Sequence, residues 1–217
     1  MIKLIFIRHP TTIWEKQQRY LGRTDIALSR KGERQAELIS DYLRNKNISA
    51  IYSSSLIRAY QTASIIDKHQ SLKVKKDKQL NEIDFGEWEG MTFNQIRKRY
   101  PKLAQKYLSN PLNTKIPGAE SLLKFRNRIN KAIEKILAQK KGTVAIISHA
   151  GVNRIIICSL FKLPLSYFWQ IKQDIGAINI IEIYQDIHPV KSCEAGISQK
   201  AKSFNGVNII SLINQAL

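Results

Sequence analysis

Two histidines stand in the same kind of position, each directly after a short apolar segment. Arg8 and His9 follow Leu4-Ile5-Phe6-Ile7, and His149 follows Val144-Ala-Ile-Ile-Ser148, after which a small-residue turn begins. A strand that ends in this way delivers a cation and an imidazole to one place, where they could hold or attack a phosphoryl group. A lone histidine is more often structural, so the repetition of the pattern is what favours catalysis.

Two further residues complete a set that could cleave a phosphate ester without a metal. Such cleavage needs a nucleophile, fixed positive donors for the phosphoryl oxygens and an acid for the leaving group. Arg58 is a second guanidinium able to hold phosphate oxygens in pairs, and Glu82 begins an acidic loop. Asp84 and Glu87 in the same loop are alternatives to Glu82, and a simple ion pair with a neighbouring helix is the alternative for Arg58.

Alternating strand-like and helix-like segments would position these residues. Buried strands are predicted at 3–7, 48–52, 143–148 and 177–184, and helices at about 29–45, from about 56, at 120–139 and at 152–161. Serines 53–55 could cap the second helix, and Glu120 with Ser121 the third. We therefore predict an α/β fold with a mostly parallel sheet, helices on both faces, and the reactive residues at the carboxyl edge.

The remaining segments suggest one domain over residues 1–217 with two additions. Helical pieces interrupted by prolines at about 91–118 predict a small insert over the active-site edge. Residues 185–206 have little periodicity and predict an irregular tail, long for a compact domain. Residues 207–213 are again strand-like and would pair with 178–184 as an edge strand, which leaves a homodimer open.

Composition excludes some functions and leaves others open. Apolar residues make up 43% and charged residues 24%, and no segment approaches the roughly 18 apolar residues of a membrane span. The short apolar start is too brief for a signal peptide, so a cytoplasmic location and no membrane partner are predicted. The net charge is +18, yet its densest runs, 73–78 and 97–99, lack stacking aromatics, which argues for solvated faces and against nucleic acid.

The candidate residues fall within six motifs that occur in a fixed order. They are Arg8-His9; Arg19-Tyr-Leu-Gly22 with Asp25 and Leu28; Tyr52-Ser-Ser-Ser-Leu-Ile-Arg58-Ala-Tyr-Gln61-Thr62-Ala63; Leu80-Asn-Glu82-Ile-Asp-Phe-Gly-Glu-Trp88-Glu-Gly90; Pro117-Gly-Ala-Glu120-Ser121; and Ser148-His149-Ala-Gly151. Together they resemble the histidine phosphatase superfamily, also called the phosphoglycerate mutase-like fold, up to about Tyr184. The 85–90 segment and the short insert after it resemble the phosphatase branch, particularly α-ribazole phosphatase and its broad-specificity relatives.

The resemblance implies a role for each candidate residue and no cofactor or metal. His9 would attack phosphorus and become a phosphohistidine, while Arg8, Arg58 and His149 hold the transferring oxygens. Glu82 would protonate the leaving alcohol and then activate water. Substrate-pocket candidates are Glu15, Arg19, Leu21, Gly22, Thr24 and Ala150. Trp14, Phe85 and Trp88 are interpreted as packing for the loops.

Three residues near the nucleophile depart from the family pattern. Pro10 lacks an N–H and fixes φ beside His9, and Thr11 replaces a carboxylate. Glu15 replaces an asparagine that usually donates to phosphate, so its carboxylate would repel the substrate unless it turns toward a lysine. An active enzyme is still predicted, because the chain has the nucleophile, the phosphate-binding residues and the acid of the family pattern, namely His9, Arg8, Arg58, His149 and Glu82.

These observations predict a metal-independent phosphomonoesterase that acts on a small phosphorylated metabolite. α-Ribazole 5′-phosphate is the named candidate, and a broad range of small esters is the other. A phosphoglycerate mutase-type transferase and an inactive phosphate- or nucleic-acid-binding protein of the same fold are the alternatives. Specificity would come from the insert and from the loop between Arg19 and Asp25.

Overall fold

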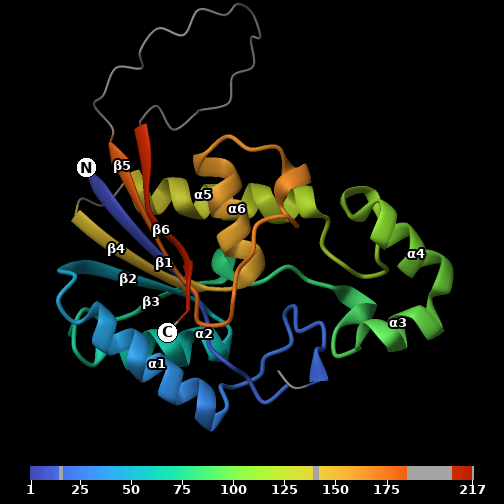
Figure 1. The fold of residues 1–217 in the computed structure, drawn as a ribbon, viewed down its shortest axis with the longest axis horizontal. Coiled ribbons are helices and arrows are strands. Elements are labelled where there is room, and N and C mark those ends of the chain that lie inside the picture. The colour runs from blue at the N-terminus through green and yellow to red at the C-terminus, as the bar shows by residue number, and fades with distance from the viewer. Residues whose placement is uncertain (15–16, 139–141, 185–206, 217) are drawn as a thin grey trace, which may run out of the picture.

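The computed structural model describes residues 1–14, 17–138, 142–184 and 207–216. These residues form a six-stranded sheet in the order β3-β2-β4-β1-β5-β6 (Figure 1). The strands are β1 Ile2–Arg8, β2 Ile48–Ser54, β3 Lys75–Asp77, β4 Gly142–Ser148, β5 Ile178–Tyr184 and β6 Val207–Gln215. Strands β1 to β4 pair in parallel, whereas β5 runs antiparallel to both of its neighbours. The predicted mostly parallel α/β sheet is confirmed.

Helices cover both faces of the sheet, as predicted. They are α1 Arg30–Leu43, α2 Ile57–Asp67, α5 Leu122–Ala138 and α6 Ala150–Leu160. Leu4 and Phe6 of β1 pack into the core beneath α5 and α6, while Ile5 and Ile7 pack into the core beneath α1 and α2. Successive side chains of a strand point to opposite faces. A strand covered on both sides is therefore apolar along its covered part, which is why residues 4–7 of β1 form a continuous apolar run.

The ends of the helices agree only partly with the predicted caps. Ser29 caps α1, because its side chain accepts from the N–H of Gly32. The predicted serine cap of α2 is confirmed only in part: the Ser54 hydroxyl accepts from the N–H of Leu56 at 3.2 Å, but Leu56 is the N-cap residue and has no side-chain cap bond. Instead the Asp25 carboxylate accepts from the N–H of Ile57 at 2.6 Å. The cap comes from a distant loop, and a local pattern could not reveal it.

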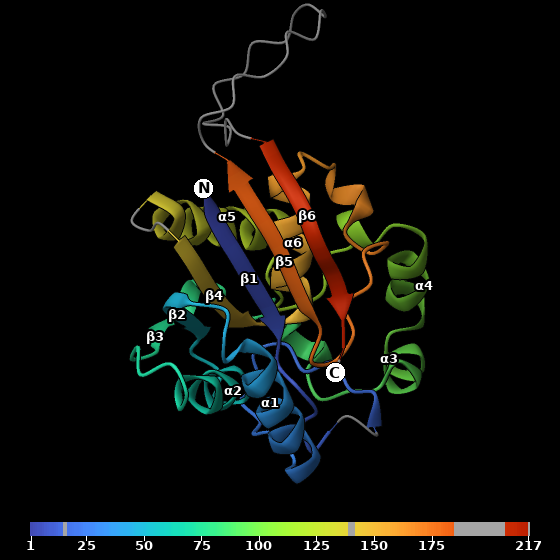
Figure 2. The same cartoon turned by 60° about the vertical axis from the view of Figure 1, so that its left-hand side comes forward.

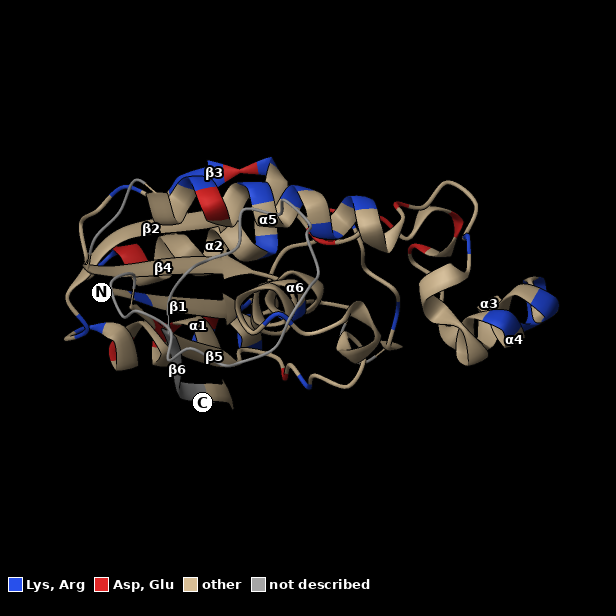
Figure 3. Ribbon diagram, turned by 90° about the horizontal axis from the view of Figure 1, so that it is seen from above, with Lys and Arg blue, Asp and Glu red and all other residues tan. Residues whose placement is uncertain are grey.

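The insert contains two short helices, α3 Phe93–Arg99 and α4 Pro101–Ser109. Figure 3 shows both beyond the carboxyl ends of the strands. Trp88 is fully buried and packs with Ile96 and Ala104 in a small core of their own, so its predicted packing role is confirmed. The arginine and lysine side chains at 97–99 are exposed, as predicted.

The remaining segments were predicted with mixed success. The edge strand β6 pairs with β5 as predicted, whereas β3 was not predicted, because Lys75 and Lys76 are exposed and give no apolar signal. Residues 185–206 and Glu15 lie outside the described residues. Among the described helices, none has the length and apolar character to cross a membrane.

Candidate active site

The two histidines lie side by side because of the register between β1 and β4. Arg8 pairs with Ser148 in this parallel ladder, and the N–H of His9 donates to the Ser148 carbonyl at 2.9 Å. His9 and His149 therefore leave the sheet at the same level. Their ring centroids are 5.2 Å apart with an interplanar angle of 65°, and both side chains are buried.

The hydrogen bonds of His9 define which ring nitrogen carries the proton. Nδ1 lies 2.8 Å from the Pro10 carbonyl, and Nε2 lies 3.1 Å from Nε of Arg58. A guanidinium can only donate, so Nε2 of His9 accepts and Nδ1 donates to the Pro10 carbonyl. This tautomer leaves the lone pair on Nε2, the atom that faces the arginine. Pro10 thus holds His9 through its carbonyl; the predicted cost of its missing N–H stays a prediction.

Arg58 is completely buried in the first turn of α2. Besides His9, its guanidinium donates to the carbonyls of Thr24 at 2.8 Å and Gly22 at 2.7 Å. Gly22 has a φ of +48°, and a Cβ there would lie 2.0 Å from the Glu89 carboxylate and displace it, so glycine suits this turn. The alternative of a simple ion pair with a neighbouring helix does not describe Arg58. Burial lowers its pKa to about 10, against the raising effect of Glu82 and two other acids.

His149 presents a second buried imidazole to the same place. Its Nε2 lies 2.8 Å from the Ser54 hydroxyl at the end of β2, and its Nδ1 is buried with no hydrogen-bond partner among the described residues. Burial is the main cause that holds the pKa values of both histidines well below the usual range, and the charges of Arg58 and Arg8 act in the same direction. Both rings are therefore neutral at pH 7.

Glu82 is oriented by two backbone N–H groups. Its carboxylate accepts from Gly151 at 3.0 Å and from Ile83 at 3.0 Å. Gly151 follows His149 by two residues, so this contact places the carboxylate at the start of α6 beside the histidine pair. A Cβ on residue 151 would lie 2.3 Å from the Glu82 oxygen. Gly151 thereby makes room for the carboxylate.

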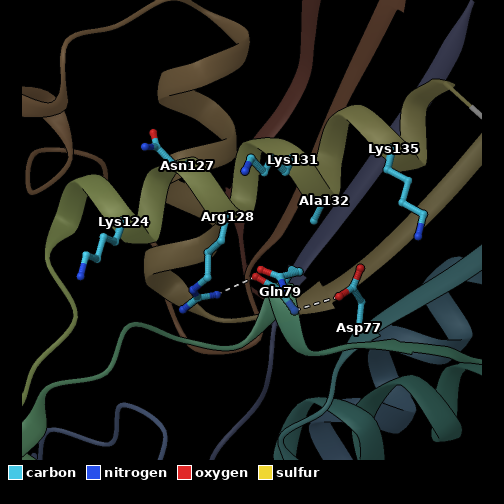
Figure 4. Close-up of a pocket in the computed structure, with 8 residues that line it drawn as sticks. All are labelled: Asp77, Gln79, Lys124, Asn127, Arg128, Lys131, Ala132 and Lys135. Carbon is cyan, nitrogen blue, oxygen red and sulfur yellow. Dashed lines mark hydrogen bonds between the residues drawn. The ribbon is translucent and has the colours of Figure 1, made fainter.

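Arg128 of α5 holds the backbone of the Glu82 loop. Its guanidinium donates to the carbonyls of Gln79 at 2.6 Å, Asn81 at 2.7 Å and Glu82 at 2.9 Å. Figure 4 shows the contact with Gln79. Glu120 fixes the same guanidinium through two bonds of 2.7 and 2.8 Å. The predicted capping role of Glu120 is therefore wrong, while Ser121 does cap α5 by accepting from the N–H of Lys124.

A pocket of about 220 Å³ opens beside His9. Its lining consists of Arg8, His9, Pro10, Thr11, Thr12, Trp14, Gln18, Arg19, Leu21 and Ile175. Arg8 also donates to the Gln173 carbonyl at 2.7 Å, which fixes one arm of its guanidinium. His9 and the guanidiniums of Arg8 and Arg19 thus line one small cavity, and Arg58 bonds to His9. A neutral nitrogen among fixed cations is an arrangement suited to transfer of a phosphoryl group.

Comparison with known proteins identifies the family. The profile of the histidine phosphatase superfamily (branch 1) matches residues 4–194. The chain belongs to this superfamily. Phosphoserine phosphatase 1 of Hydrogenobacter thermophilus is 33% identical over 184 residues, covering 84% of this chain and 87% of the relative. Phosphoglycerate mutase-like protein 4 of Arabidopsis thaliana is 33% identical over 156 residues, covering 70% and 68%.

A solved structure of the same fold agrees over nearly the whole chain. A putative α-ribazole-5′-phosphate phosphatase from Escherichia coli superposes with a TM-score of 0.84 at 21% identity, covering 99% of this chain and 97% of that one. This likeness shows the fold. With the family established, the chain is a phosphatase that hydrolyses phosphoric monoesters.

The histidine phosphatase fold brings some of the predicted pocket residues together and separates others. Arg19 and Leu21 line the pocket. The carbonyls of Gly22 and Thr24 instead accept hydrogen bonds from Arg58. Ala150 is the first residue of α6. Trp14, interpreted as packing, lines the pocket and lies beneath the Arg19 guanidinium at 5.7 Å.

The two alternatives to Glu82 are engaged elsewhere in this histidine phosphatase. The Asp84 carboxylate accepts from the N–H of Gly86 at 2.8 Å and lies 3.8 Å from Arg23. Glu87 is exposed and accepts from the Tyr100 hydroxyl at 2.7 Å. Neither contact involves the histidine pair, so the geometry favours Glu82.

Two larger hollows lie elsewhere on the described surface. One of about 570 Å³ lies between the insert and the 83–85 segment, and includes Tyr107 and Trp169. The other, of about 640 Å³, follows α5 past Lys124, Lys131 and Lys135 (Figure 4). Among the described residues, no group of three or more His, Cys, Asp or Glu side chains could hold a metal ion.

Proposed function

We propose that this phosphatase works without a metal through a phosphohistidine on His9. The observation that carries the proposal is the tautomer of His9, whose Nδ1–H is tied to the Pro10 carbonyl while Nε2 accepts from Arg58. A neutral imidazole with its lone pair fixed toward the Arg58 guanidinium is an activated nucleophile for an anionic phosphoryl group. The low pKa of His9 keeps that lone pair available at neutral pH.

In the first half-reaction, Nε2 of His9 forms a bond to phosphorus while the bond from phosphorus to the ester oxygen breaks. Arg58 turns its Nε–H from the imidazole to a phosphoryl oxygen, and Arg8 and His149 bind the others. Glu82 acts as the general acid and gives a proton to the leaving alkoxide. The phosphoryl group then rests on His9, and the alcohol departs.

In the second half-reaction, the Glu82 carboxylate takes a proton from water. The resulting hydroxide attacks phosphorus, the bond to Nε2 breaks, and inorganic phosphate leaves. Glu82 thereby regains the proton that it gave in the first half-reaction. An acid and base of this kind contributes typically about 10²–10⁴-fold to a rate.

The pocket supports a small substrate. Its volume of about 220 Å³ lies below the roughly 300–1,000 Å³ of pockets for drug-sized ligands. Arg19 in the lining could bind a carboxylate of the alcohol portion. A phosphorylated hydroxy amino acid such as phosphoserine fits both features, and the relative named phosphoserine phosphatase 1 supports it. α-Ribazole 5′-phosphate, a larger ester, is the competing candidate.

Rapid quench of the enzyme with a labelled substrate tests the intermediate. We expect base-stable, acid-labile phosphate on His9, absent from His9→Asn and present in His69→Asn, a matched control because His69 is exposed. A chain that turns over substrate without any such label would refute the proposal. A panel with phosphoserine, α-ribazole 5′-phosphate and 3-phosphoglycerate then ranks substrates, and an isomerised product in place of free phosphate would indicate a mutase.

A further inference from the structure

A buried polar network supports the Arg8 guanidinium. Its centre is Gln173, which is 4% exposed. The carbonyl of Gln173 accepts from Arg8 at 2.7 Å, so the position of this one peptide group sets one arm of the guanidinium. What holds Gln173 in place therefore also holds a residue of the proposed phosphate site.

The side-chain amide of Gln173 is bonded at both ends. Its Oε1 accepts from Asn153 at 3.0 Å and from Asn179 at 2.9 Å, and its Nε2 donates to Asn179 at 3.0 Å. Asn179 also donates to the Phe6 carbonyl in β1. Asn153 in turn accepts from the hydroxyl of Ser148, the residue before His149. Gln173 is thus linked through Asn179 to β1 and through Asn153 to Ser148 at the end of β4.

The C-terminal strand supplies the outer part of the network through Asn214. Its Oδ1 accepts from the N–H of Asp174 at 2.5 Å, and its Nδ2 donates to the Asp174 carboxylate at 2.8 Å. Its own N–H donates to Asn179 at 3.0 Å. Figure 2 shows why this contact is available: β6 ends at the edge of the sheet at which β1 ends.

We propose that Asn214 is a positioning residue for Arg8, so that the last strand of the chain completes the phosphate site. The two bonds from Asn214 clamp Asp174, and the peptide group joining Gln173 to Asp174 presents the carbonyl that Arg8 uses. Satisfied buried networks of this kind hold a unique geometry. The inference rests on the proposed role of Arg8 in binding phosphate.

The backbone of Asn214 points to the variant that tests this. Its φ is +58°, a region that glycine occupies freely and alanine does not. Asn214→Gly therefore removes the side chain without adding backbone strain. We expect both KM for a phosphate ester and the inhibition constant of inorganic phosphate to rise about tenfold, the effect of weakening one hydrogen bond to a charged group. The isosteric Asn214→Asp, which sets a carboxylate against Asp174, should raise both constants too if the glycine variant does not fold.

Tyr184→Phe is the matched control, because it removes a 2.9 Å side-chain bond at the other end of the β5–β6 ladder. We expect it to leave both constants unchanged. If Asn214 acts through Arg8, the effects of the two substitutions are not additive. In an Arg8→Lys background, Asn214→Gly should therefore have no further effect on the inhibition constant of inorganic phosphate. Unchanged constants in Asn214→Gly, or full additivity with Arg8→Lys, would overturn the inference. If Arg8→Lys itself leaves phosphate inhibition unchanged, it is the proposed role of Arg8 that fails.

Discussion

Replacing Gly151 by alanine should damage catalysis far more than folding. In the first turn of α6, alanine ordinarily stabilises a helix by up to about 1 kcal/mol relative to glycine. Here the new Cβ would lie 2.3 Å from Oε1 of Glu82 and 3.2 Å from the ring of Phe125. The nearest atom belongs to the end of a flexible side chain, so the carboxylate can move away. It cannot do so and keep its 3.0 Å bond to the Gly151 N–H.

The magnitude follows from what the displaced carboxylate loses. Its removal from the bond to Gly151 costs about 1.5–3 kcal/mol, the value of a hydrogen bond to a charged group, which offsets the helical gain of alanine and leaves a net destabilisation near 1 kcal/mol. The catalytic loss is larger, because a misplaced acid and base forfeits most of its roughly 10²–10⁴-fold contribution. We expect kcat to fall by about 10²-fold or more with little change in KM.

Steady-state kinetics and urea unfolding of Gly151→Ala measure both quantities. Ile155→Val is the control, since it lies on the same helix, is fully buried, and costs about 0.5–1.5 kcal/mol without touching Glu82. The double variant with Glu82→Gln should be no slower than Glu82→Gln alone. A Gly151→Ala enzyme with higher stability and normal kcat would refute the placement of Glu82.

Two further predictions concern electrostatics and the Glu82 loop. The folded-state pKa values of His9 and His149 lie well below 6.5. Below about pH 6.5 the unfolded chain therefore binds protons that the folded chain does not. As the pH falls, these two sites lower the free energy of unfolding by up to about 2.7 kcal/mol per pH unit. Urea unfolding between pH 7 and pH 5 should show a shallower decline for His149→Asn, and parallel curves would contradict the shift. Arg128→Met should release the carbonyls of the Glu82 loop and lower kcat about tenfold beyond any loss of folded protein. Thermal unfolding measures the folded fraction, and steady-state kinetics measure kcat. An unchanged kcat in the folded variant would mean that the loop needs no such support.

The sequence predicted five of the six strands and the residues that gather at the edge of the sheet, and missed only β3 among the described strands. Parallel neighbours need a crossover connection, usually a helix, and predicted helices separate the apolar runs that end in His9 and His149. The structure pairs these two strands so that Arg8 lies opposite Ser148. The Arg58 helix was placed by the same reasoning. Local pattern and position in a parallel sheet carry this information without any contact being known.

The supporting contacts were beyond such reasoning because they join residues far apart in the chain. Asp25 caps α2 from 32 residues away, and Arg128 reaches loop carbonyls more than 45 residues earlier. Ser54, beside His149, was interpreted as a helix cap, since a serine at a strand end has the same local signature in both roles. An arginine such as Arg128 in an amphipathic helix has the sequence pattern of a solvent-exposed residue, and only the structure shows that its guanidinium is bonded to the Glu82 loop.

The electrostatics of the pocket explain why phosphate, rather than any anion near a basic protein, is the expected ligand. The hydrogen bonds of Arg58 go to neutral acceptors, namely His9 and two carbonyls, and burial lowers its pKa despite nearby acids. The folded chain therefore bears a desolvation cost that a bound dianion would relieve. A net charge of +18 adds long-range attraction, which salt screens within about 10 Å. Salt does not screen a buried guanidinium of fixed geometry in this way. Specificity for phosphate therefore resides in the buried guanidinium groups and not in the surface charge.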